Sequence, residues 1–337
     1  MAQSLFDIDR RLAGPRLGSV ASHWPRRVLT RRGLQIALGL VWLLDGLLQF
    51  QPFMFTKAFA QQVIAAVGQG QPSFVAVPVQ WAADIIAAHP VAWNIPFASL
   101  QVLIGIALLV PRTVRLGLAV SVAWAAAVWY LGEGLGGLAS GHVSLLSGAP
   151  GAVLLYGLLA LAAWPRRSEP HARPAAWLVG VWAVLWVGAA IFQALPGQNT
   201  GADVAAIVSG SADSAPGWLA HLDTGLAPWI AHHGTAVVVA LVVVEALIGI
   251  GALVRGTRSY AAIAGIGLAA AIWLFCQSAS ALTTGQATDL NTAPLVALLG
   301  VAVLGVDAAW PARIRRGAGD HRAIGDGTER ETSPQTV

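Results

Sequence analysis

The chain contains eight apolar stretches that approach the length needed to cross a lipid bilayer. They lie at residues 33–51, 93–110, 116–131, 150–164, 176–195, 235–254, 261–277 and 294–310. A helix of about 20 apolar residues spans the hydrocarbon core. Of the 337 residues, 56% are hydrophobic and only 11% are charged, whereas soluble domains carry about 25% charged residues. The sequence therefore predicts an all-α integral membrane protein with eight transmembrane helices.

The chain also repeats itself at a single offset of 144 residues. Residues 103–110 read Leu-Ile-Gly-Ile-Ala-Leu-Leu-Val, and residues 247–254 read Leu-Ile-Gly-Ile-Gly-Ala-Leu-Val. At the same offset Trp42 aligns with Trp186. Matches at one offset over most of the chain indicate an internal duplication. Because each copy holds an even number of helices, we expect two parallel four-helix bundles.

The predicted organisation follows from this duplication. It comprises a cytoplasmic N-terminal segment (1–32), a first membrane unit (33–165), a cytoplasmic linker (166–174), a second membrane unit (175–310) and a disordered cytoplasmic tail (311–337). Eight crossings place every arginine on one side of the membrane and leave only Lys57 on the other. The positive-inside rule then puts both termini in the cytoplasm. The strong preference for arginine over lysine indicates GC-rich coding, so we expect a bacterial plasma (inner) membrane.

Two long segments, 52–92 and 196–236, follow the first helix of each unit on the outer side. They contain amphipathic stretches such as residues 79–88, which favour a position in the membrane interface. We expect these segments to cover the outer ends of the helices.

Several cofactor classes are excluded by the sequence. The single cysteine, Cys276, excludes a cysteine-ligated iron–sulfur cluster. No histidine falls in the centre of a predicted helix, which excludes a mid-membrane haem. The glycine-rich residues 132–137 lack the Lys-Ser/Thr of a phosphate-binding loop, so we expect no nucleotide. The net charge of +4 is explained by the membrane topology, so we expect no nucleic-acid partner.

Gly46 stands three residues before Gln49 at the end of the first predicted helix. Glu245 opens a Glu-x-x-x-Gly motif that ends at Gly249, and Gln101 begins the corresponding motif of the first unit. These short motifs resemble those of the DoxX-like membrane family, which includes the DoxD subunit of thiosulfate:quinone oxidoreductase. The first helix of that family ends in a Gly-x-x-Lys signature, and this chain has Gln49 in place of the lysine. The resemblance implies a tandem pair of DoxX-like four-helix bundles. It also implies quinone or sulfur redox chemistry and a partner redox or periplasmic subunit.

Two acids lie inside predicted membrane helices, Asp45 and Glu245. Ionisable groups at this depth are costly and mark functional sites. Their functional interpretation is proton transfer to a quinone or substrate, and the alternative is a neutral carboxyl bonded to a neighbouring helix. The 144-residue offset aligns Asp45 with Ala189 and Glu245 with Gln101, so acid chemistry would be asymmetric between the units.

Other polar and aromatic residues cluster near the outer helix ends and could line a pocket there. Glu133 is a further catalytic candidate, and the candidates for ligand binding are Gln49, Gln193, Gln101, His89, His233, His142, Trp129 and Trp273. The alternative is an ordinary hydrated helix end. His89 and His233 are equivalent across the repeat and could meet around a metal, but helix capping is the favoured interpretation, and we assign no metal site.

Two functions remain open at this stage. The first is a membrane subunit of a quinone-linked oxidoreductase that presents an outer-face pocket to quinone or a small reductant. The second is a non-enzymatic membrane protein that binds or moves a small or lipidic ligand, or scaffolds a partner complex. The resemblance favours the first function, and the lack of a cofactor motif favours the second.

Overall fold

The computed structural model describes residues 30–165 and 173–306, and these residues form helices joined by turns, without a strand. We call residues 30–165 the first half and residues 173–306 the second half. The predicted tail, and most of the predicted N-terminal segment and linker, lie outside the described residues.

The first half contains five α-helices and several short helical turns. Its α-helices are α1 (Arg31–Leu48), α2 (Ser73–Ala88), α3 (Pro90–Leu109), α4 (Val114–Leu131) and α5 (Ala152–Ala162). Its shorter turns are η2 (Pro52–Phe55), η3 (Phe59–Ile64), η4 (Ala65–Gly68) and η5 (Gly134–Ser140).

The second half repeats this order with one more α-helix. Its elements are α6 (Leu178–Gln193), α7 (Gly201–Ala212), α8 (Gly217–His232), α9 (Gly234–Leu253), α10 (Arg258–Phe275), η6 (Ser278–Ala281) and α11 (Thr292–Val306). Helices α2, α3 and α4 recur as α8, α9 and α10 with both ends shifted by the same 144 residues. Helix α7 takes the place of the short elements η3 and η4.

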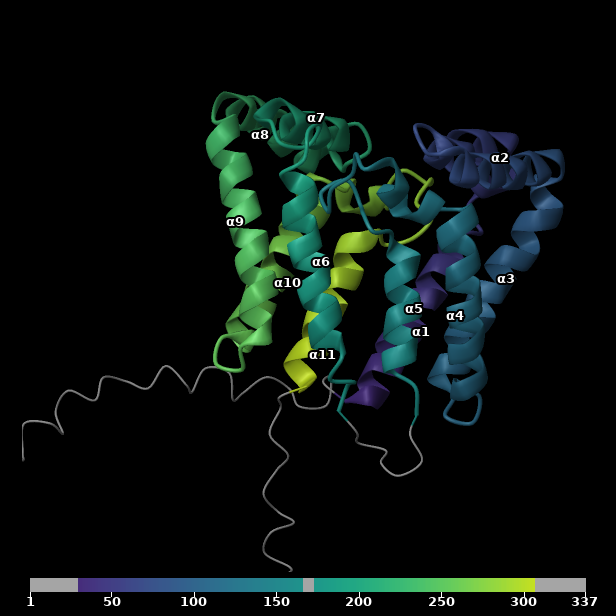
Figure 1. Ribbon diagram of the computed structural model, residues 1–337. Coiled ribbons are helices and arrows are strands. Elements are labelled where there is room, and N and C mark those ends of the chain that lie inside the picture. The colour runs from purple at the N-terminus through teal and green to yellow at the C-terminus, as the bar shows by residue number, and fades with distance from the viewer. Residues whose placement is uncertain (1–29, 166–172, 307–337) are drawn as a thin grey trace, which may run out of the picture.

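Most helices run side by side between two faces, and three lie across one of these faces (Figure 1). Helices α2, α7 and α8 cover the face drawn at the top, which we call the upper face. Helices α3, α4, α9 and α10 are long and apolar enough to cross a membrane, whereas α5, α6 and α11 are apolar but shorter. An all-helical, multi-pass membrane architecture is thereby supported by four helices, and the total of eight crossings stays a prediction.

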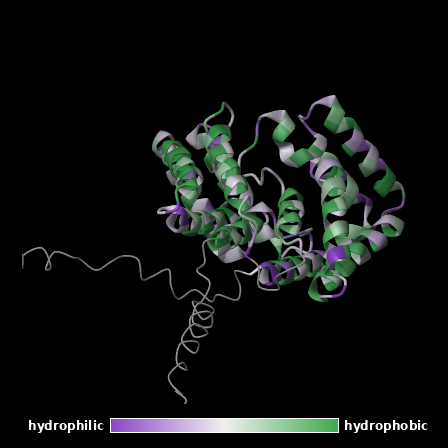
Figure 2. Cartoon of the chain, turned by 60° about the horizontal axis from the view of Figure 1, so that its bottom comes forward, coloured by the Kyte–Doolittle hydropathy of each residue, from purple (hydrophilic) through white to green (hydrophobic). Residues whose placement is uncertain are grey.

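The helices are largely hydrophobic, as Figure 2 shows by residue hydropathy. Leu103, Leu116 and Leu247 are each at least 60% exposed although they lie on these helices. A water-soluble protein rarely exposes such continuous apolar surface. These side chains therefore suit contact with lipid tails.

Glycines bring the helix backbones into close contact in both halves. A Cβ atom on Gly105 of α3 would lie 2.8 Å from the carbonyl oxygen of Gly39 on α1. A Cβ atom on Gly249 of α9 would lie 3.0 Å from the carbonyl oxygen of Ala183 on α6. Small residues permit such close packing between membrane helices. The α1–α3 and α6–α9 pairs are thus built in the same way.

The upper-face helices α2 and α8 each bury one stripe and expose another. On α2, Val75 and Val79 are buried whereas Phe74 and Trp81 are about 60% exposed. On α8, the buried stripe is Leu219, Asp223, Ala227 and Ile230, and the exposed stripe includes Trp218 and Trp229. Exposed tryptophans beside apolar residues are typical of helices that lie in a membrane interface.

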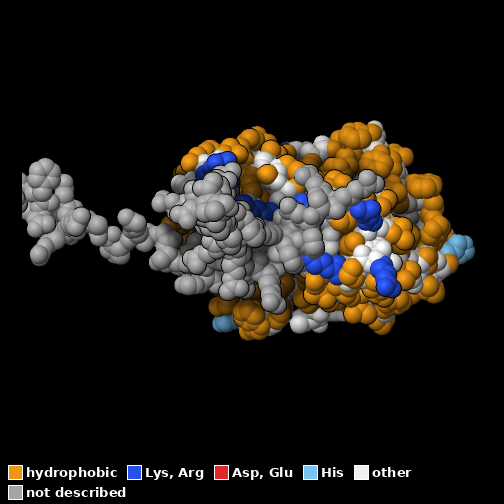
Figure 3. Space-filling model, turned by 90° about the horizontal axis from the view of Figure 1, so that it is seen from below, with side chains coloured by type: hydrophobic (Ala, Val, Ile, Leu, Met, Phe, Trp, Pro, Cys, Tyr) orange, Lys and Arg blue, Asp and Glu red, His pale blue; other side chains and the backbone are white. Residues whose placement is uncertain are grey.

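The opposite, lower face carries basic side chains (Figure 3). Arg32 donates to the carbonyl oxygens of Leu108, at 2.9 Å, and Leu109, at the end of α3. Arg258 donates to the carbonyl oxygen of Ala252 at 2.7 Å, at the end of α9. Guanidinium groups at helix C-termini satisfy free carbonyl groups and interact favourably with the helix dipole. The basic residues therefore anchor the helix ends on this face.

Candidate functional site

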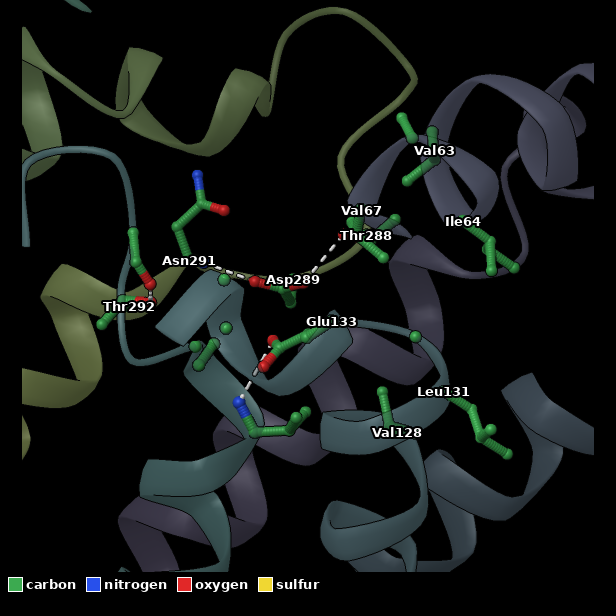
Figure 4. A pocket seen from close by; sticks show the side chains of 18 of the residues that line it. Val63, Ile64, Val67, Val128, Leu131, Glu133, Thr288, Asp289, Asn291 and Thr292 are labelled. Atoms are coloured by element: carbon green, nitrogen blue, oxygen red, sulfur yellow. Dashed lines mark hydrogen bonds between the residues drawn. The ribbon is translucent and has the colours of Figure 1, made fainter. Parts of the chain in front are cut away.

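A cavity of about 840 Å³ lies near the upper face, within the first half. Its walls come from α1, α2, α3, α4, the turns η3 and η4, and the segment around residues 132–153. Residues 288, 289, 291 and 292 of the second half complete it (Figure 4). Sites for small molecules typically enclose about 300–1,000 Å³. The cavity therefore has the size of a small-molecule site.

Aromatic side chains form much of the cavity wall: Trp42, Phe59, Phe97 and Trp124. The rings of Phe97 and Trp124 lie 5.2 Å apart, centre to centre. The Trp42 indole nitrogen donates to the Ser121 hydroxyl at 2.9 Å, which fixes the orientation of the ring. The cavity thus offers a preorganised apolar surface.

Asp45 lines the cavity from α1 and is only 2% exposed. One of its carboxyl oxygens accepts a hydrogen bond from the Tyr156 hydroxyl of α5. The other oxygen, Oδ1, is buried and has no hydrogen-bond partner among the described residues. A buried polar atom without a partner is costly, so this oxygen is available to a ligand or a proton.

Glu133 follows α4 and reaches the beginning of α5. Its Oε1 atom accepts a hydrogen bond from the backbone N–H of Val153 at 3.3 Å, as a capping residue does. Gly151, with φ of 98°, makes room for it, because a Cβ atom there would lie 2.2 Å from Oε2 of Glu133. That Oε2 atom is buried and unpartnered in the described part of the chain. Burial and the neighbouring Asp289 raise the pKa of Glu133 to about 8.

Asp289 enters the same cavity from the loop that precedes α11 (Figure 4). It accepts hydrogen bonds from the Thr288 hydroxyl at 2.8 Å and from the Asn291 backbone N–H at 2.6 Å. Burial raises the pKa of Asp289 above its ordinary value, and these hydrogen bonds oppose that rise. The second half therefore contributes a carboxyl group to the cavity of the first half.

Reciprocal contacts hold this loop in place. Gln51 of the first half donates to the carbonyl oxygen of Ala287 at 3.2 Å, and the Thr292 hydroxyl donates to the carbonyl oxygen of Gly148. Gln277 of the second half donates to the carbonyl oxygen of Leu145 at 3.2 Å. Each half thus sends a loop into the other at the upper face.

The described residues that line the cavity carry three carboxyl groups and neither lysine nor arginine. His142 is the histidine among them. Since charges interact strongly in a partly buried site, ionisation of the acids would give the cavity a negative potential.

The structure brings some of the residues predicted from the sequence into one place. The predicted residues that line the cavity are Asp45, Gln49, Gln101, Glu133 and His142. These five come from α1, α3 and the segment after α4, and all lie in the first half.

The other predicted residues do not line this cavity. Glu245 is buried in α9, and neither of its carboxyl oxygens has a partner in the described ranges. Trp129 donates to the carbonyl oxygen of Pro150 at 2.8 Å, and Trp273 donates to the Ser280 hydroxyl at 2.7 Å. Gln193 donates to the carbonyl oxygen of Gln198. These contacts are typical of structural roles.

The two equivalent histidines stand at corresponding helix ends. His89 directly precedes α3, and His233 directly precedes α9. The Nδ1 atom of His233 lies 2.9 Å from the carbonyl oxygen of Trp229. Among the described residues, no group of three or more His, Cys, Asp or Glu side chains is placed to hold a metal ion.

Two residues of the site were missed from the sequence, Asp289 and Tyr156. Tyr156 had a detectable signal, because a tyrosine inside an otherwise apolar helix needs a partner for its hydroxyl. Asp289 had none, because the 144-residue offset aligns it with Leu145 and its loop crosses to the other half.

No protein-family model, no curated protein and no solved structure matches this chain.

Proposed function

We propose that this chain is a multi-pass membrane protein that binds an amphiphilic small molecule in the cavity of its first half. The observation that carries this proposal is the 840 Å³ cavity itself, which joins aromatic walls to buried, partly unpartnered carboxyl groups. Binding sites for small molecules combine a largely apolar wall with a few convergent polar groups in this way.

The proposed membrane arrangement has eight crossings, formed by α1, α3, α4, α5, α6, α9, α10 and α11. The shared helix bounds of the two halves support a tandem duplication into two parallel DoxX-like bundles. The basic lower face supports a cytoplasmic location for that side and for both termini. The cavity then opens toward the outside of a bacterial plasma membrane.

A second candidate function is supported by the Asp45–Tyr156 hydrogen bond beside the cavity. A hydroxyl–carboxyl pair of this kind can pass a proton to a reducible carbonyl group. In that function the chain is the membrane subunit of a quinone-linked oxidoreductase, with quinone or a small reductant in the cavity and a partner redox or periplasmic subunit. The DoxX-like resemblance points to the same function.

The direct test is to purify the full chain in mild detergent and to identify bound molecules by mass spectrometry and visible spectroscopy. Val128→Trp places a large ring in the cavity wall, whereas Leu116→Trp adds the same ring on the exposed side of the same helix. We expect a ligand that co-purifies with the wild type and with Leu116→Trp but not with Val128→Trp. A bound quinone would select the second candidate.

Identical extracts from all three proteins, containing only bulk phospholipid, would refute the proposed function. Size-exclusion chromatography checks that Val128→Trp remains folded and monodisperse. A folded Val128→Trp protein that keeps its ligand would place the binding site elsewhere.

A further inference from the structure

We propose that the ligand of this cavity is an amphiphilic organic cation, which enters in exchange for a proton. This inference rests on the proposed function and names the chemical class of the ligand.

The first argument is the convergence of carboxyl groups from three separate segments. Asp45 comes from α1, Glu133 from the end of α4, and Asp289 from the loop of the other half. Two of their oxygens, Oδ1 of Asp45 and Oε2 of Glu133, are buried without a partner in the described structure. A cation, or an ammonium N–H donor, would supply the kind of partner that these oxygens lack, because buried charges are stable only when paired.

The second argument is the aromatic wall. Trp42, Phe59, Phe97 and Trp124 surround the same space as the acids. Cations bind favourably over the faces of such rings, with tryptophan the best of them. An organic cation with an apolar body would use the walls and the acids together.

Size and geometry argue against an inorganic ion. The cavity of about 840 Å³ is far larger than a metal ion needs. Within the described ranges, the carboxyl groups do not form a metal-binding cluster. They are therefore spread around a volume that suits a larger cation.

The charged groups around the cavity are mainly acidic. Besides the three acids, Tyr156 on α5 bonds to Asp45, and His142 lines the wall. Lys57, before η3, is exposed and does not line the cavity.

The remaining elements around the cavity add no opposing charge to it. Asp84 on α2 is exposed and accepts from Gln80 at 2.8 Å. Tyr130 on α4 donates to the carbonyl oxygen of Phe74 at 2.6 Å. Arg115 lies near the beginning of α4, at the opposite end from the cavity. Helix α3 has no charged residue along its length.

Proton exchange follows from the state of the empty site. With its pKa raised to about 8, Glu133 holds a proton near neutral pH while the cavity is empty. A bound cation stabilises the carboxylate, so the proton leaves to water as the cation enters. No covalent bond other than the O–H bond changes, and the charge of the site is conserved.

The second half supplies a matched comparison. Gln277 stands at the position equivalent to Glu133, donates to the carbonyl oxygen of Leu145 at 3.2 Å and accepts from the backbone N–H of Ala293 at 3.1 Å. Both ends of its neutral amide are therefore satisfied within the protein. Glu133→Gln imitates this arrangement and removes the charge at nearly constant size.

The test uses tetraphenylphosphonium as the cationic probe and triphenylphosphine oxide as the neutral probe, with the full chain in detergent. Equilibrium dialysis at pH 6 and pH 8.5 measures binding, and a pH indicator in weak buffer measures proton release. We expect tetraphenylphosphonium to bind about 75-fold more tightly at pH 8.5 than at pH 6, since a group with a pKa near 8 must lose its proton. About one proton should be released per cation near pH 7.

Glu133→Gln should weaken binding at pH 8.5 by about tenfold or more and abolish its pH dependence. Asp213→Asn removes an exposed acid of the second half. It should change neither the affinity at pH 8.5 nor the pH dependence of binding. The cation inference is overturned if the neutral probe binds in a Val128→Trp-sensitive manner while the cation does not, or if cation binding is independent of pH. If neither probe binds at a site sensitive to Val128→Trp, the proposed function itself fails.

Discussion

The two halves share their helix bounds but fill their interiors differently. In the first half, Asp45 and Tyr156 form a buried polar pair. The equivalent positions in the second half are Ala189 and Gly300. There Trp182 occupies the space, since a Cβ atom on Gly300 would lie 3.0 Å from its ring.

The exchange of residues is complementary. Trp182 is equivalent to Leu38, and Gly265, which would place a Cβ atom 2.3 Å from the Trp182 ring, is equivalent to Ser121. In the second half, the large Trp182 ring packs against Gly265 and Gly300. The equivalent positions in the first half hold the smaller Leu38 and the polar residues Ser121 and Tyr156. Cores tolerate such compensated exchanges when the total volume is kept. The acidic cavity is therefore a specialisation of the first half on a shared scaffold.

The largest expected effect comes from Gly136→Ser, which gives the first half the residue that the second half has at Ser280. Both positions have φ of 61°. A Cβ atom on Gly136 would lie 1.9 Å from the carbonyl oxygen of Pro150. Because this oxygen belongs to the backbone, relieving the clash requires the backbone itself to shift. We expect a loss of about 3 kcal/mol or more in the free energy of unfolding, measured by thermal melting in detergent.

The control for this change is Gly70→Ser, where φ is 71° but no atom lies within 4 Å of the added Cβ. Its cost should be limited to about 1–2 kcal/mol, the usual penalty of a left-handed residue. Equal melting temperatures for the two variants would show that the contact with Pro150 does not matter.

Glu133→Gln should alter how stability depends on pH. The folded-state pKa of Glu133 is raised from 4.5 to about 8, so the folded state holds this proton more tightly than the unfolded state does. Stability is therefore greatest below pH 4.5 and is lost as pH rises toward 8. Because solvent screens this half-buried group, we expect a loss of about 1–2 kcal/mol.

In Glu133→Gln this decline should flatten, whereas Asp213→Asn should retain it. Melting curves between pH 5 and pH 9 measure the difference. If the stability of Glu133→Gln declined with pH by the same amount as that of the wild type, the decline would come from other titratable groups.

A smaller difference is expected between Trp42→Phe and Trp186→Phe. Trp42 donates to the Ser121 hydroxyl, whereas the equivalent indole nitrogen of Trp186 is buried without a partner among the described residues. Trp42→Phe therefore loses a hydrogen bond that Trp186→Phe does not, and should cost about 1 kcal/mol more. Chemical denaturation of both variants tests this, and equal losses would contradict the asymmetry.

The smallest effect is a gain in stability from Ala279→Gly. Ala279 has φ of 48° inside a left-handed turn, where the first half has the sequence Gly-Leu-Gly-Gly. Glycine removes the steric cost but adds conformational entropy to the unfolded chain. We expect a net stabilisation of about 0.5 kcal/mol, visible as a small rise in melting temperature. A fall would indicate that the methyl group packs usefully.

The helical class was predictable because it depends on hydropathy, whereas the duplication, inferred from self-similarity of the sequence, stays a prediction. The 144-residue offset appears in the bounds of α2, α3 and α4 and their counterparts. Asp45, Glu133 and Gln101 could be chosen as candidates because polar groups in apolar surroundings are visible in a sequence. Asp289 could not, because its role depends on a loop that crosses between the halves, which no local pattern encodes.

The most direct test of the account is the accessibility of single cysteines in a Cys276→Ser background. Two equivalent exposed pairs are available: Thr113 and Thr257 toward the lower face, and Gln69 and Asp213 toward the upper face. A membrane-impermeant maleimide applied to intact spheroplasts should label cysteines at 69 and 213, and should label those at 113 and 257 only after lysis. Labelling of one lower position but not its equivalent in intact spheroplasts would mean inverted halves, and would contradict the parallel arrangement on which the outward-facing cavity depends.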